Sequence, residues 1–118
     1  MDDPLIVLRR EFEAAEGSFL LGLRGVDLVW DRAAFTRLEQ AMRLACERFE
    51  GRDDLPRWMA EGFYEISHFV REWTSHPGFP RPEPVQYYQD CLQRLQELAD
   101  RFFRGWHAYP EPHVWLDL

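Results

Sequence analysis

Hydrophobic side chains recur every three or four positions along four stretches of this chain, which is the pattern of amphipathic helices. The stretches are residues 3–17, 31–51, about 55–74 and 84–105. A helix of about 20 residues is about 30 Å long, so three of the stretches would form long rods. The pattern predicts an all-α fold, in which residues 1–118 form a single domain of about four helices packed as an antiparallel bundle.

Capping residues mark the ends of these stretches. Asp3, Asp31 and Asp54 are the predicted N-caps, because an aspartate side chain accepts hydrogen bonds from the unpaired N–H groups of a first helical turn. Glycine tolerates the left-handed conformation that ends many helices, and it is found at the end of three stretches, as Gly17, Gly51 and Gly105. Local chemistry and periodicity therefore place the helix boundaries together.

The apolar stripe of each predicted helix gives the expected core. The inward residues are Leu5, Leu8, Phe12 and Ala15 in the first helix; Phe35, Leu38, Met42, Ala45 and Phe49 in the second; Leu55, Met59, Phe63, Ile66, Phe69, Val70 and Trp73 in the third; and Val85, Tyr88, Cys91, Leu92, Leu95, Leu98, Ala99 and Phe102 in the fourth. These residues are enough for one hydrophobic core.

Two segments do not follow the helical period. Residues 18–30 fit either a short helix at 18–24 or an extended chain in which apolar residues partly alternate with polar ones. The tail from about residue 105 is irregular, because Pro110 and Pro112 exclude a helix there. Its aromatic content is high for a free end, so we expect the tail to pack on the bundle; the alternative is a strap that binds a partner.

The charge balance narrows the class of partner. The chain has 14 basic and 21 acidic residues and a formal net charge of −7. This excess of acid argues against a nucleic-acid binder, which needs a basic face, and favours attraction to a basic partner. All 14 basic residues are arginine, which we interpret as codon bias in a GC-rich bacterial genome. No run of about 18 apolar residues occurs and the N-terminus is acidic, so we expect a cytoplasmic protein without a membrane span.

Few residue patterns point to catalysis. Cys46 and Cys91 fall on the apolar sides of predicted helices and are expected to be buried free thiols. No nucleophile elbow and no phosphate-binding glycine loop occurs in the chain. We therefore expect no enzyme and no cofactor.

Acidic residues and a histidine gather on one face of the third predicted helix. They are Glu61, Glu65, His68 and Glu72, and the Glu65–His68 spacing is that of carboxylate-bridged di-metal bundles. A metal pair needs a second such motif on another helix, and none is present. We therefore favour a solvated face over a metal site. A site formed by His68, His76 and His107 is a further alternative.

One alternative is a helical ribonuclease. Arg71 and His76 have the spacing of the arginine–histidine signature of helical ribonucleases of the higher-eukaryote-and-prokaryote nucleotide-binding class, and so do Arg101 and His107. In that family the pair faces a dimer cleft and handles a scissile phosphate. The residues resemble that signature at two positions only, and the net charge disfavours RNA.

The connector between the third and fourth helices is the most unusual stretch. It is stiffened by Pro77, Pro80, Pro82 and Pro84 and carries Phe79 between a glycine and a proline. One interpretation is that Phe79 plugs an end of the core. The other is an aromatic recognition patch with an acidic rim, formed by Glu72, Trp73, Phe79, Glu83, Tyr87, Tyr88 and Asp90.

The segment around this connector resembles the immunity proteins of colicin-type nucleases. His68-Phe69, Thr74, His76-Pro77 and the pair Tyr87-Tyr88 match the core segment of those small acidic helical proteins. The resemblance implies that Tyr87, Tyr88 and Asp90 contact a basic toxin. Our leading hypothesis is a protein-binding module, most simply an immunity or antitoxin-like protein that neutralises a bacterial toxin by direct binding; a structural adaptor is the remaining alternative. The sequence does not indicate an oligomeric state.

Overall fold

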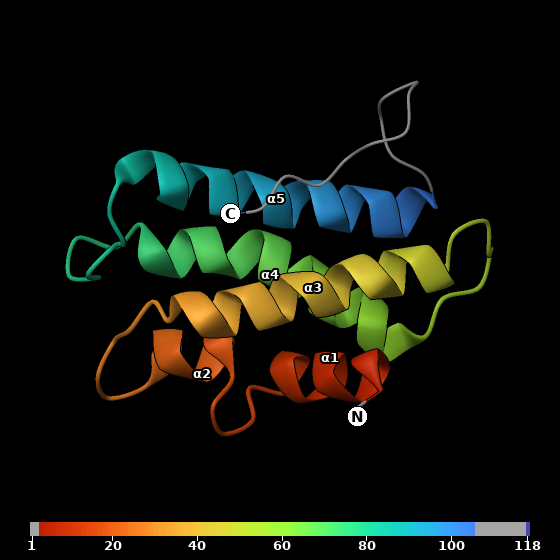
Figure 1. Ribbon diagram of the computed structural model, residues 1–118, viewed down its shortest axis with the longest axis horizontal. Coiled ribbons are helices and arrows are strands. Elements are labelled where there is room, and N and C mark those ends of the chain that lie inside the picture. The colour runs from red at the N-terminus through yellow and green to blue at the C-terminus, as the bar shows by residue number, and fades with distance from the viewer. Residues whose placement is uncertain (1–2, 106–117) are drawn as a thin grey trace.

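The chain folds into helices joined by loops, as the computed structural model in Figure 1 shows. The structure describes residues 3–105 and residue 118. Within these residues there are five helices and no strand: α1 (Pro4–Phe12), α2 (Phe19–Arg24), α3 (Arg32–Arg48), α4 (Arg57–Thr74) and α5 (Val85–Arg104). The predicted all-α class is confirmed. The short α2 is additional to the four long stretches, and it settles the 18–24 segment as a helix.

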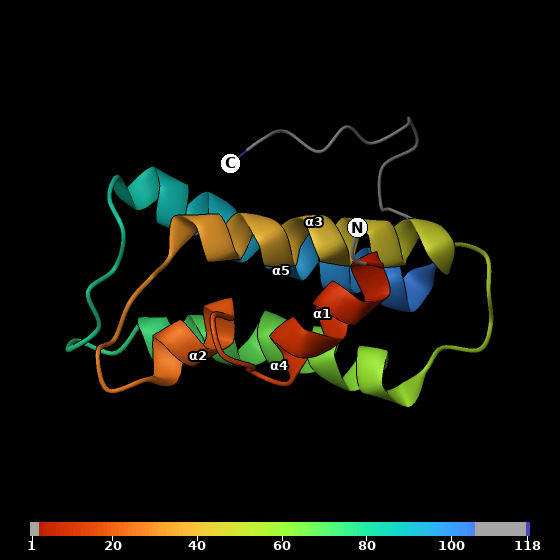
Figure 2. The same cartoon turned by 60° about the horizontal axis from the view of Figure 1, so that its bottom comes forward.

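The helices form two layers. Figure 2 shows α3 and α5 in one layer and α1, α2 and α4 in the other. Helix α4 packs against α5, while α1 and α2 each pack against both α3 and α4. The colours of Figure 1 show that α4 runs in the opposite direction to α3 and α5. The end of α4 and the starts of α3 and α5 therefore lie at the same end of the molecule.

Two of the three predicted aspartate caps are confirmed. Asp3 accepts a hydrogen bond from the Leu5 N–H at 2.8 Å, and Asp31 accepts one from the Ala34 N–H at 3.1 Å. The prediction of Asp54 as a cap is wrong, because α4 begins at Arg57 with Pro56 as its N-cap. A residue that precedes a proline is kept out of the helical conformation, so the helix cannot extend back to residue 55.

The predicted core is largely confirmed. Aromatic contacts join the helices inside it, and the Phe63 and Phe102 rings of α4 and α5 stack with centroids 4.1 Å apart. Seven expected core residues lie further out: Val85 is 65% exposed, and six are only partly buried, namely Leu5, Phe12, Ala15, Leu55, Phe69 and Trp73. Val85 is the first residue of α5, directly after the connector.

The first predicted helix ends earlier than expected. Helix α1 stops at Phe12, and the chain turns through Ala14 and Gly17, which both have positive φ, of 55° and 82°. This turn leads into α2, where the Ser18 side chain accepts a hydrogen bond from the Leu21 N–H at 3.2 Å. The glycine at 17 therefore belongs to the turn between two helices and not to the end of one long helix.

The expected packing of the tail falls on residues 106–117, which lie outside the described residues. The last residue, Leu118, is described, and it lines a shallow pocket together with α3 residues that include Phe35 and Glu39.

Candidate protein-binding surface

The structure brings the predicted site residues to one end of the molecule. Glu72 and Trp73 belong to the last turn of α4, Phe79 and Glu83 to the connector, and Tyr87, Tyr88 and Asp90 to the first turns of α5. The loop that leads from α2 to α3 lies at the same end, on the left in Figure 1. We call this region the connector end and define it as loop 25–31, connector 75–84 and the helix ends that meet them.

Two of the predicted partner-binding residues are buried, so their assignment to an exposed patch is wrong. Phe79 is 5% exposed and belongs to the core, as the alternative interpretation of the connector expected. Tyr88 is 8% exposed, and its hydroxyl lies 2.6 Å from that of the buried Thr74. Because the Thr74 hydroxyl donates to the Val70 carbonyl, it accepts from Tyr88. Both aromatic side chains hold the connector end together from inside.

Tyr87 is half-buried and links three parts of the connector end. Its hydroxyl accepts a hydrogen bond from the Trp30 indole N–H at 3.4 Å, and the Arg32 guanidinium lies 3.9 Å from its ring centroid. Arg32 also donates to the Glu83 backbone carbonyl. Burial raises the pKa of Tyr87, so its phenol stays protonated at neutral pH. Tyr87 is therefore a half-buried aromatic side chain that the Trp30 and Arg32 contacts hold in place.

Hydrogen bonds from backbone N–H groups and from the Arg81 side chain hold the connector in one shape. The Phe79 N–H donates to the His76 carbonyl at 2.9 Å, and the Gly78 N–H donates to His76 Nδ1 at 3.2 Å. Arg81 donates to the carbonyls of Thr74 and His76, at 3.1 and 3.2 Å. A connector with this many internal contacts loses little conformational entropy when a partner binds.

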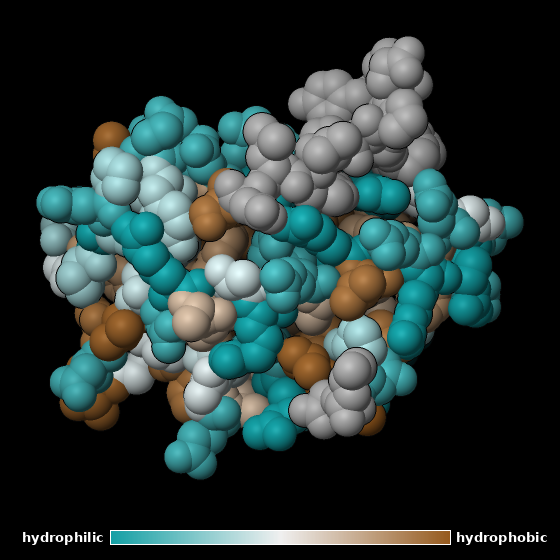
Figure 3. Space-filling view, viewed as in Figure 1, coloured by the Kyte–Doolittle hydropathy of each residue, from teal (hydrophilic) through white to brown (hydrophobic). Residues whose placement is uncertain are grey.

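The loop before α3 carries an apolar surface that the sequence did not assign. Leu21 of α2 is 40% exposed, and the loop residues Val26, Leu28 and Val29 are 102%, 42% and 45% exposed. The Val29 N–H donates to the Gly22 carbonyl at 2.9 Å, which holds the loop against α2. Hydrophobic atoms are visible over this region at the lower left of Figure 3. The signal in the sequence is the apolar run after Gly25, but the exposure of these side chains depends on the tertiary fold.

An aromatic row continues from the connector end along the outer face of α4. We define the aromatic row as Tyr64, His68, Phe69 and Trp73. Their rings follow one another with centroid distances of 5.8, 4.9 and 5.6 Å. The Arg24 guanidinium of α2 lies 5.1 Å from the Trp73 ring and so covers one end of the row. Only Trp73 of this row was part of the predicted recognition patch.

The described residues of the metal and ribonuclease alternatives lie on α4 and α5 and in the connector. His68 Nε2 lies 3.9 Å from Glu72, which is an ion pair only when the imidazole is protonated. Among residues 3–105 and 118, no group of three histidine, cysteine or acidic side chains is placed to hold a metal ion. His76 accepts the Gly78 N–H, and Arg71 is exposed on α4. His107 lies outside the described residues.

Both cysteines are buried and free, as expected. Burial raises the pKa of Cys46 to about 12 and that of Cys91 to about 11. The Cys46 thiol also lies 3.5 Å from the Leu98 carbonyl, to which it donates. The two thiols therefore remain protonated at neutral pH, where a nucleophile would need to be a thiolate.

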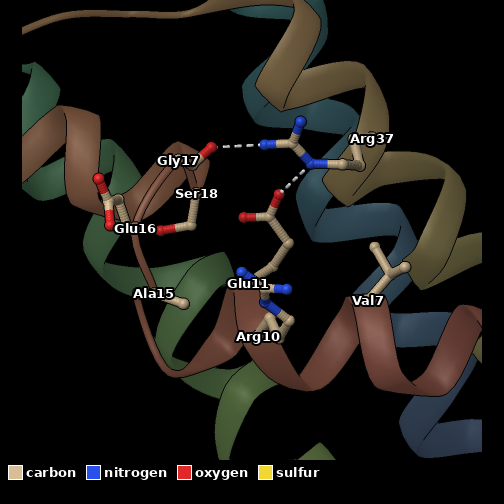
Figure 4. A pocket seen from close by; sticks show the side chains of 8 residues that line it. All are labelled: Val7, Arg10, Glu11, Ala15, Glu16, Gly17, Ser18 and Arg37. Carbon is tan, nitrogen blue, oxygen red and sulfur yellow. Dashed lines mark hydrogen bonds and ion pairs between the residues drawn. The ribbon is translucent and has the colours of Figure 1, made fainter. Parts of the chain in front are cut away.

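A polar pocket of about 240 Å³ lies between the α1–α2 turn and α3, far from the connector (Figure 4). Glu11 is 2% exposed, and its carboxylate accepts from Arg37 Nε at 2.8 Å and from the Phe19 N–H at 3.0 Å. Arg37 also donates to the Gly17 carbonyl at 2.5 Å. These contacts join the turn to α3, so we interpret the pocket as a structural feature.

Among the described residues, no helix combines the length and apolar character needed to cross a lipid bilayer. Comparison with known proteins found no matching family model, no similar curated protein and no similar solved structure.

Proposed function

We propose that this chain is a protein-binding module whose connector end covers a surface of one protein partner. The observation that carries the proposal is the exposed apolar loop with Val26, Leu28 and Val29; the residue that follows them, Trp30, donates a hydrogen bond to the half-buried Tyr87. Contiguous exposed apolar side chains on a small domain are typical of interaction sites. Aromatic rings supply much of the binding energy at such sites because they offer large rigid surfaces.

The connector end is built from segments that are held in place before binding. The loop is tied to α2 through Val29 and the connector to α4 through Arg81. The Arg32 contacts then join the start of α3 to Tyr87 and to the Glu83 carbonyl. Preorganisation lowers the entropy lost on association, so such a surface favours tight binding to one shape of partner.

The class of module that we propose is an immunity or antitoxin-like protein that neutralises a basic bacterial toxin domain. Three features support it: the net charge of −7, the local resemblance around the connector, and the acidic side chains Glu72, Glu83 and Asp90 at the connector end. Acidic groups steer a basic partner to the surface and raise the association rate. Of the two tyrosines in the resemblance, Tyr87 is the one with an exposed part.

Capture from an extract of the native cell tests this proposal. Three baits are compared: the unmodified chain, the variant V26D/V85D and the matched control I6D/F103D. The control also replaces two exposed apolar side chains, at positions away from the connector. We expect one stoichiometric partner on the unmodified chain and on the control. We expect recovery on V26D/V85D to fall by about tenfold or more, because two charges would be buried in the interface.

Two outcomes contradict the proposal. Equal recovery on both double variants would remove the connector end from the interface. The absence of any stoichiometric partner, together with a molar mass in solution of twice that of the chain or more, would instead favour a structural subunit that buries its apolar loop in a homo-oligomer.

A further inference from the structure

The aromatic row on α4 is partly exposed: Arg24 covers Trp73, whereas Tyr64 and His68 lie at the surface. Tyr64 is 57% exposed, and the side chains of His68 and Glu72 are 57% and 64% exposed. The opposite face of α4, with Phe63, packs into the core. Helix α4 is therefore buried on one side and carries the stacked Tyr64 and His68 rings on the other, while Phe69 and Trp73 are partly buried.

The charges beside the aromatic row are mostly negative. Glu61, Glu65 and Glu72 project from the same outer side of α4, because positions separated by three, four, seven or eleven residues fall on one face of a helix. Two exposed arginines of α4 lie near them: Arg57, four residues before Glu61, and Arg71, directly before Glu72. A surface that carries both aromatic rings and carboxylates is complementary, in shape and in charge, to a planar cationic group.

A groove beside this face contains a guanidinium of the chain itself. The groove has a volume of about 230 Å³ and lies between α1 and α4, where Glu61 and Glu65 form part of its wall. In it, the Arg9 guanidinium lies 5.2 Å from the Trp58 ring centroid and 3.2 Å from the Glu13 carboxylate.

The same combination of ring and guanidinium occurs where Arg24 covers Trp73 at the other end of the row. Between Trp58 and Trp73, no arginine of the described residues lies over the Tyr64 or Phe69 ring, and Glu65 directly follows Tyr64 in the helix.

We propose that the outer face of α4 binds an arginine-rich segment of the basic protein partner, an inference that rests on the proposed function and extends its surface. Guanidinium groups of the partner stack on Tyr64 and Phe69 and pair with the neighbouring carboxylates. Arginine fits better than lysine, because its planar group stacks on aromatic rings and forms two parallel hydrogen bonds to a carboxylate.

Peptide binding to the full chain tests the inference without knowledge of the native partner. The probes are a labelled oligoarginine peptide and an oligolysine peptide of equal length and charge, with an oligoglutamate peptide as the negative control. Affinity is measured by fluorescence anisotropy, and the contacted residues are mapped by amide NMR shifts. We expect oligoarginine to bind more tightly than oligolysine and to shift resonances between residues 61 and 73.

Matched variants separate this face from the general negative charge. E61Q/E65Q/E72Q removes three charges from the α4 face, and E47Q/D53N/D100N removes three charges from exposed positions elsewhere. The α4 variant is expected to bind oligoarginine about tenfold or more weakly, and the control variant at most about twofold more weakly, because distant charges are screened. Tyr64→Ala, at an exposed position, is expected to reduce the preference for oligoarginine over oligolysine.

Equal losses in the two triple variants, or NMR shifts centred away from α4, would overturn the inference. Equal binding of oligoarginine and oligolysine would overturn the stacking role of the rings. These outcomes can be distinguished from those of the capture experiment. A failure here removes Tyr64, Phe69 and the neighbouring carboxylates as a binding surface and leaves the loop 25–31 and the connector 75–84 untouched, whereas equal capture by the aspartate variants removes the connector end whatever the peptides do.

Discussion

Replacing Arg37 with methionine is expected to lower the free energy of unfolding by about 3 kcal/mol, because the change leaves the Glu11 carboxylate buried without its cation. Glu11 is 2% exposed, and without Arg37 its carboxylate keeps the Phe19 N–H as its hydrogen-bond donor within the described residues. The same arginine holds the Gly17 carbonyl (Figure 4), so the turn between α1 and α2 loses its tie to α3 as well. Methionine preserves most of the packing of the arginine stem.

Arg48→Met is the matched control in the same helix. Arg48 pairs with Asp3 at 3.2 Å, and the two side chains are 47% and 48% exposed. Exposed pairs of this kind contribute at most about 1 kcal/mol, so urea unfolding of the control should nearly match that of the unmodified chain. A loss in Arg37→Met no larger than in Arg48→Met would show that the Glu11 carboxylate reaches water and that the pair does not hold the turn.

Phe79→Ala is expected to destabilise the fold by about 3–4 kcal/mol, the usual cost of removing a large aromatic side chain from a core. The sequence alone left two roles for this residue, in the core or in a binding surface. The structure places it in the core, where it is 5% exposed. Because Phe79 fixes the connector from inside, its loss should also loosen the hydrogen bonds at His76. Chemical denaturation and amide exchange of residues 76–79 measure the two effects.

Tyr64→Ala is the control for this change, since it removes an aromatic side chain of similar size that is 57% exposed. Its expected effect on stability is within about 0.5 kcal/mol. If Phe79→Ala were as stable as Tyr64→Ala, the connector would not depend on Phe79 for its shape. A weakened partner affinity in Phe79→Ala would then point to direct contact, as the sequence-based hypothesis held.

The helices could be predicted because their determinants are local. Periodic apolar residues, the caps Asp3 and Asp31 and the glycine at 105, which has a φ of 77°, all act within one or two turns. The start of α4 differs from the prediction because Asp54 has the chemistry of an N-cap, but Pro56 keeps the residue before it out of the helical conformation. The sequence does not decide between a helix and an extended chain for α2. Two glycines weaken this six-residue segment, and a helix this short is stabilised mainly by packing.

The candidate surface could be predicted only in part. Proline spacing and aromatic content pointed to the connector, and the structure places the predicted residues at one end of the molecule. Whether a given ring lies inside or outside depends on which neighbours the fold supplies. The Tyr88 hydroxyl is buried because it forms a hydrogen bond with the hydroxyl of Thr74. Val26 is exposed because no element within the described residues covers the loop before α3.

Site-specific photo-crosslinking in the native cell tests the central claim most directly, which is that the connector end contacts a protein partner. A photoreactive phenylalanine analogue is placed at Val26, which is 102% exposed in the loop before α3, and for comparison at Asp53, which is exposed in the loop before α4 at the other end of the molecule. We predict a single crosslinked protein from position 26 and none from position 53. No adduct from position 26, or the same adducts from both positions, would contradict the account.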